Sequence, residues 1–114
     1  MSGGDKPDLV ARFEGMLAAG RDGALVRYGL GIEYLKRGDV ETALVHLKNA
    51  LEQDPGYSAA WKQYAGALAQ AGQDAEALEA YRRGIEVAEG KGDMQAAKEM
   101  RVFLRRLHKQ GAGS

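Results

Sequence analysis

Two stretches of the chain, RYGLGIEYLKRGDVETALVHLKNALEQDP at residues 27–55 and WKQYAGALAQAGQDAEALEAYRRGIEVAE at residues 61–89, align with each other at an offset of 34 residues. Small or apolar residues coincide at the positions expected to form a core: Ala43 with Ala77, Leu47 with Tyr81, and Leu51 with Ile85. A period of this length is typical of stacked helical units, each of which buries its apolar face only against its neighbours.

Each repeat contains two segments with the apolar spacing of an amphipathic helix. Between them stands Gly38-Asp39 in the first repeat and Gly72-Gln73 in the second. Glycine readily forms the left-handed cap that ends a helix, and a polar residue after it caps the next helix. Pro55 ends the second helix of the first repeat, and Ser58 is a candidate cap for the helix that follows. We predict six helices, over residues 7–19, 24–37, 40–53, 59–71, 74–89 and 93–109.

The two outer helices are predicted to protect the ends of the repeat array. A shift of 34 residues toward the N-terminus places Phe13 at the position of Leu47, so a half repeat precedes the first full one. The final helix carries Met100, Phe103 and Leu107 at helical spacing. Residues 7–109 are therefore expected to form one domain. The Gly- and Ser-rich tails, residues 1–6 and 110–114, are expected to be disordered.

The composition limits the possible functions. The chain has 114 residues, with 16 Lys and Arg balanced by 16 Asp and Glu, so its net charge indicates neither a nucleic-acid partner nor an anionic membrane. There is no apolar run of about 18 residues and no apolar stretch near the start, and we expect a cytoplasmic protein without a membrane partner. Cysteine is absent, and His46, on the polar side of its helix, is interpreted as a surface residue. We predict no metal and no cofactor.

These residues resemble the tetratricopeptide repeat family, whose pattern is W-x2-L-G-x2-Y, then A-x3-F, then P. The first unit matches it at Leu30-Gly31, Tyr34, Ala43 and Pro55, with Arg27 in place of Trp; the second matches it at Trp61 and Ala77. The resemblance implies an all-α fold, a right-handed α-α superhelix. It would hold two full repeats, at about 24–57 and 58–91, between N- and C-terminal capping helices. It also implies a non-catalytic protein-interaction module.

In this family the first helix of each pair lines a concave groove, so the resemblance supplies candidate peptide-binding residues. They are Tyr28, Ile32 and Leu35 from the first repeat, Lys62, Gln63 and Gly66 from the second, and Lys98, Arg101 and Arg105 from the last helix. The expected partner is a protein or peptide with an apolar anchor and an acidic group, because Arg and Lys recognise carboxylates.

Several alternatives stay open for these residues. Tyr28 can instead fill the seam left by the absent Trp at Arg27. Arg105 can be a solvated cation at a helix C-terminus. The whole chain can be a monomer or a weak homo-oligomer, since an incompletely capped end favours self-association. Nucleic acid would bind the basic final helix only without sequence specificity. Scattered acids such as Glu33 form no catalytic constellation.

Overall fold

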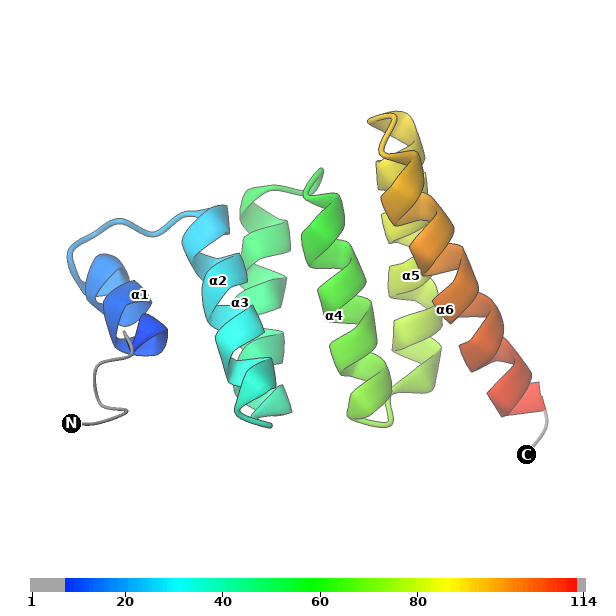
Figure 1. Cartoon of the computed structure of the whole chain (residues 1–114), viewed down its shortest axis with the longest axis horizontal. Coiled ribbons are helices and arrows are strands. Elements are labelled where there is room, and N and C mark those ends of the chain that lie inside the picture. The colour runs from blue at the N-terminus through cyan, green and yellow to red at the C-terminus, as the bar shows by residue number, and fades with distance from the viewer. Residues whose placement is uncertain (1–7, 113–114) are drawn as a thin grey trace, which may run out of the picture.

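The computed structural model describes residues 8–112, which form six α-helices and no strand (Figure 1). In chain order the helices are α1 (Leu9–Ala18), α2 (Ala24–Lys36), α3 (Val40–Gln53), α4 (Ser58–Gln70), α5 (Asp74–Gly90) and α6 (Met94–Ala112). In Figure 1, α2, α4 and α6 lie side by side, with α3 behind α2 and α5 behind α6. The predicted all-α superhelical repeat fold is confirmed.

The turns inside the two repeats share one backbone geometry, although the predicted side-chain cap forms at Asp39 and not at Gln73. Gly38 and Gly72 both have a φ of 78°, in the left-handed region that favours glycine. The next amide closes each turn: Asp39 N donates to Tyr34 O at 2.9 Å, and Gln73 N donates to Leu68 O at 2.9 Å. This geometry turns the chain back on itself, so that each second helix packs against the first.

The turns between repeats differ from the prediction at Ser58. Tyr57 is the N-cap residue of α4, and no side chain caps that end. The Ser58 hydroxyl instead donates to Asp93 Oδ2 at 2.9 Å, while Asp93 Oδ1 accepts from Ala96 N at the start of α6. Ser58 therefore joins the start of α4 to the start of α6.

Small residues set the distance between neighbouring helices. Ala43 and Ala77 are both fully buried, at equivalent sites of the two repeats. A Cβ at Gly31 would lie 2.5 Å from Leu47 Cγ, and one at Gly84 would lie 2.6 Å from Met100 Sδ. The helices thus approach too closely for a larger side chain unless a neighbour moves.

The ends of the stack are covered by α1 and α6. Val10 of α1 forms a buried cluster with Val26 and Leu30 of α2, and Phe13 packs against it. At the other end, Met100 of α6 is fully buried against the cluster of α4 and α5. The prediction that a disordered tail begins at residue 110 is wrong, because α6 continues to Ala112. The Gly and Ser content of residues 110–114 suggested a tail. Lys109 and Gln110, however, are good helix formers and extend the helix. The predicted tail at residues 1–6 lies outside the described residues, as do residues 113–114.

Candidate functional site

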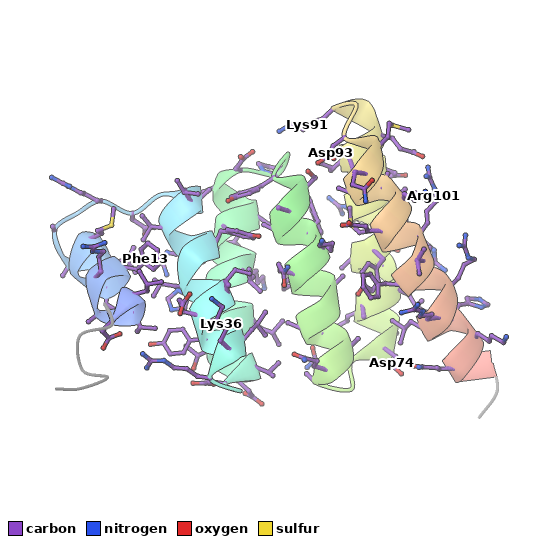
Figure 2. The ribbon with its side chains drawn as sticks, in the orientation of Figure 1. Phe13, Lys36, Asp74, Lys91, Asp93 and Arg101 are labelled. Atoms are coloured by element: carbon purple, nitrogen blue, oxygen red, sulfur yellow. The ribbon has the colours of Figure 1, made fainter. Side chains whose placement is uncertain are left out.

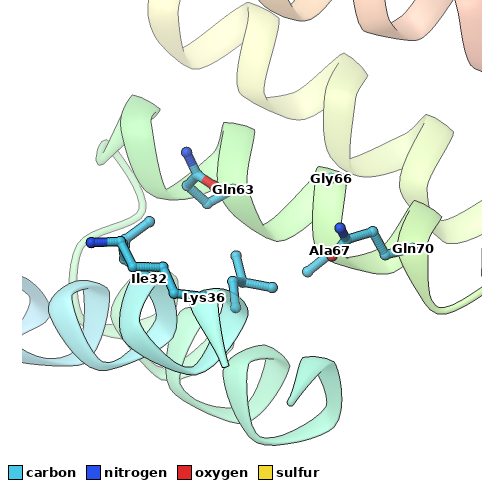
Figure 3. Close-up of a pocket in the computed structure, with 7 residues that line it drawn as sticks. Ile32, Lys36, Gln63, Gly66, Ala67 and Gln70 are labelled. Atoms are coloured by element: carbon cyan, nitrogen blue, oxygen red, sulfur yellow. The ribbon is translucent and has the colours of Figure 1, made fainter. Parts of the chain in front are cut away.

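A hollow of about 400 Å³ lies between α2 and α4, the first helices of the two repeats (Figure 3). Its lining residues come from both helices: Ile32, Leu35, Lys36, Gln63, Gly66, Ala67 and Gln70. Four of these, Ile32, Leu35, Gln63 and Gly66, are among the residues that the sequence nominated. The repeat register brings them together because both helices pack on α3 and leave a groove between their outer faces.

The two walls of this groove differ in chemistry. Ile32 and Leu35 make the α2 wall apolar, whereas Gln63 and Gln70 place amide groups on the α4 wall. An amide both donates and accepts hydrogen bonds, which suits the backbone of a bound peptide. Gly66 adds no side chain, and a Cβ there would meet only the Tyr81 hydroxyl, at 3.6 Å. The groove can therefore take an apolar side chain beside a hydrogen-bonded main chain.

An exposed apolar residue of α2, Leu25, lies outside the lining of the hollow and was not included in the sequence prediction. Leu25 precedes Ile32 by seven residues, a spacing that places both on one face of a helix. Its exposed fraction of 73% is the largest among the exposed large hydrophobic residues of the described range, residues 8–112. The seven-residue spacing was the available signal, but it was missed because the repeat alignment begins at Arg27.

Tyr28 does not line the groove. Its ring lies 4.9 Å from the ring of Tyr57, and it packs against buried residues of α3, including Ala50. Burial, followed by the nearby Tyr28, raises the pKa of Tyr57. The structure thus favours the alternative in which Tyr28 fills a seam between helices.

Lys62 is engaged by α6. Its amine lies 2.7 Å from Glu99 Oε1, and Gln95 donates to the other carboxylate oxygen at 3.0 Å. The hydrogen bond from Lys62, followed by that from Gln95, lowers the pKa of Glu99. This ion pair links α4 to α6 and neutralises Lys62 on the face where a free cation was expected.

Two basic residues of α6, Arg101 and Arg105, lie away from this groove. Arg101 forms an ion pair with Glu89 of α5, and Figure 2 shows it on the side of α6 turned away from α4. Arg101 and Arg105 line a separate hollow with α5 residues, and Lys98 is exposed. The prediction that Arg101 and Arg105 share a groove with Gln63 is therefore wrong, and for Lys98 it stays a prediction. Burial of Met100 against α5 fixes the rotation of α6 and turns Glu99 toward α4.

His46 is another correction, since it is only 8% exposed and not a surface residue. Its ring stacks on Tyr34 at 5.6 Å, and its Nδ1 lies 3.1 Å from Arg27 Nη1. Arg27 also donates to both carboxylate oxygens of Asp22, each at 2.8 Å. Burial, followed by the Arg27 charge, lowers the pKa of His46; hydrogen bonds from Arg27 and then Gln53 lower that of Asp22. This cluster joins α2 to α3 and has a structural role.

Neither a metal centre nor a membrane span emerges from residues 8–112. Within this range, no three His, Asp or Glu side chains are grouped so that they could hold a metal ion. None of the described helices combines the length and the apolarity needed to cross a membrane.

Comparison with known proteins identifies the family to which the chain belongs. The sequence model of the tetratricopeptide repeat family matches residues 34–100. A TPR repeat-containing protein of Pseudomonas aeruginosa is 50% identical over 99 residues, which cover 87% of this chain and 94% of that protein. The solution structure of a protein from Bordetella parapertussis superimposes with a TM-score of 0.82 at 41% identity, covering 94% of this chain and 93% of the other. The chain belongs to the tetratricopeptide repeat family.

A more distant structure shares the fold. The TPR2B domain of yeast Sti1, in a complex with pHsp70, has a TM-score of 0.82 at 19% identity and covers 89% of this chain and 81% of its own. At this identity the likeness concerns the fold, and the complex with pHsp70 is a property of that domain.

Proposed function

We propose that the chain is a non-catalytic interaction module that binds a segment of a partner protein in the groove between α2 and α4. One observation carries the proposal: the first helices of two adjacent repeats enclose an open hollow with one apolar wall and one amide wall. A rigid helical surface of this kind can hold an extended or helical segment.

The lining residues indicate the chemistry of that segment. An apolar side chain packs against Ile32 and Leu35, while Gln63 and Gln70 hydrogen-bond its backbone. The charged group within reach is Lys36, whose side chain is 67% exposed and 3.3 Å from Glu33. An acidic residue of the partner would pair with Lys36, and the cations Arg101 and Arg105 would take no part in this site.

A pull-down with paired variants tests the proposal. Ile32→Asp places a charge in the apolar wall, whereas Val45→Asp makes the same kind of change at an exposed apolar residue of α3, outside the groove. We expect a specific partner to be retained by the wild type and by Val45→Asp and lost with Ile32→Asp. Circular dichroism checks that both variants remain helical. A partner retained equally by both variants would place the interaction on another surface.

A further inference from the structure

Two adjoining hollows, of about 440 and 520 Å³, open between α5 and α6 at the C-terminal end of the stack. Both are lined by Arg82, Leu104 and Arg105. Ile85, Glu86 and Arg101 complete the first hollow, and His108 and Lys109 complete the second. We call this region the C-terminal end surface. It faces away from the groove between α2 and α4.

The C-terminal end surface combines an apolar floor with a basic rim. Ile85 and Leu104 are half-buried and form the floor. On the rim, Arg101 is paired with Glu89, and Arg82 is 4.0 Å from Glu79. Arg105 and Lys109 form no ion pair with any side chain in the described part of the chain. Glu86 is the one acid among the lining residues, and the cations Arg105 and Lys109, which have no ion-pair partner among the described residues, give the rim an excess of positive charge.

The repeat architecture shows what such a surface accommodates. In each complete repeat, the first helix is covered by the second, as Gly31 of α2 is covered by Leu47 of α3. The α6 helix occupies the place of a first helix, because it packs on α5 and touches α4. Within residues 8–112, no helix covers its remaining side. This surface therefore holds the position at which, elsewhere in the stack, another helix packs.

We propose that the C-terminal end surface binds an amphipathic helix of a partner protein whose apolar stripe is flanked by acidic residues. Apolar side chains one or two turns apart enter the two hollows, and the acids meet Arg82, Arg105 and Lys109. This site is separate from the groove between α2 and α4 and does not depend on it.

The charges and the apolar floor argue against other occupants. A second copy that docked symmetrically through this surface would bring two basic rims together, and like charges across an interface are unfavourable. Nucleic acid would be bound through its phosphates and would leave Ile85 and Leu104 without an apolar partner. An acidic amphipathic helix places apolar side chains against the floor and carboxylates against the basic rim.

The test uses a synthetic helical peptide of about 18 residues, with Leu on one face and Glu on both sides of that face. It is titrated into the isotopically labelled full chain and followed by NMR. We expect chemical shift changes confined to α5 and α6. Arg82→Glu/Arg105→Glu should weaken binding by about tenfold or more. Arg12→Glu/Lys48→Glu, the same charge change at exposed residues of α1 and α3, should leave binding unchanged.

Two altered peptides separate this proposal from simple charge attraction. A peptide with Lys in place of Glu should bind the Arg82→Glu/Arg105→Glu variant more tightly than the wild type. A peptide with Ser in place of Leu should bind the wild type at least about tenfold more weakly. The proposal is overturned by no binding of the first peptide, by equal affinity of the two charge-reversal variants, or by full retention with the Ser peptide. A rise in molecular mass with concentration that the Arg82→Glu/Arg105→Glu variant abolishes would also overturn it, in favour of a second copy.

Discussion

The two repeats fill one equivalent position in different ways. In the second repeat it holds Trp61, whose Nε1 donates to Pro55 O at 2.8 Å and whose ring lies 5.5 Å from the Arg83 guanidinium. In the first repeat it holds Arg27, which binds Asp22 and His46. A wide apolar ring fills the site with a single hydrogen bond, whereas a half-buried cation is held by a set of polar partners. A departure from the repeat pattern at one position thus constrains residues elsewhere in the same repeat.

The largest effect is expected at the N-terminal end, because the first repeat depends on α1. Deletion of residues 1–20 removes Val10 and Phe13 and exposes Val26 and Leu30. We expect aggregation or a loss of cooperative unfolding, measured by light scattering and thermal melting. A truncated chain that stays monomeric with unchanged melting would show that α1 is an appendage and not a cap.

Replacement of the two equivalent side chains tests the comparison directly. Trp61→Ala should lower the free energy of unfolding by about 3 kcal/mol, because it removes a large packed ring. Arg27→Ala should cost about 1.5 kcal/mol, since it leaves His46 without its hydrogen-bond partner but opens a smaller cavity. Urea unfolding of both variants provides the measurement. A greater loss for Arg27→Ala would mean that the polar cluster, and not packed volume, dominates this position.

The small residues should behave alike in the two repeats. Ala77→Leu should destabilise the chain by about 1 to 3 kcal/mol through overpacking, and Ala43→Leu by a similar amount, because both sites are fully buried. Denaturant unfolding measures both losses. A neutral result for either variant would show that its helices can separate, contrary to the close packing described above.

The smallest expected effect is a pH dependence confined to the first repeat. The lowered pKa of His46 means that the folded state favours the neutral ring, while the unfolded state titrates near 6.5. The unfolded state therefore binds the proton more readily, and this contribution to stability is present above pH 6.5 and is lost as the pH falls below it. Unfolding between about pH 7.5 and 5.5 should show the loss, and His46→Gln should reduce it. Identical pH profiles of the two chains would assign the titration to another group.

Local periodicity predicted the helices, and the resemblance to the tetratricopeptide repeat family implied which of their residues would line a groove. The spacing of Leu30, Tyr34 and Leu35 reflects the backbone period itself, so the positions of Ile32 and Gln63 on their helices followed from it. The rotation of α6 about its own axis could not be predicted from the repeat period. It depends on the packing of Met100 against Gly84, after a connection that departs from the repeat. The burial of His46 could not be predicted from local spacing either, since it depends on a contact with Arg27, 19 residues away.

The central claim, that a partner segment occupies the groove between α2 and α4, is tested most directly by filling the groove. Gly66→Leu would place a side chain in the hollow, whereas Gly15→Leu places one on α1 where a Cβ meets nothing within 4 Å. Both replace a helical glycine, so both should raise helix propensity by a similar amount. With the partner found by pull-down, we expect calorimetric titration to show at least about tenfold weaker binding for Gly66→Leu and unchanged binding for Gly15→Leu. Equal affinities of the two variants would contradict the claim.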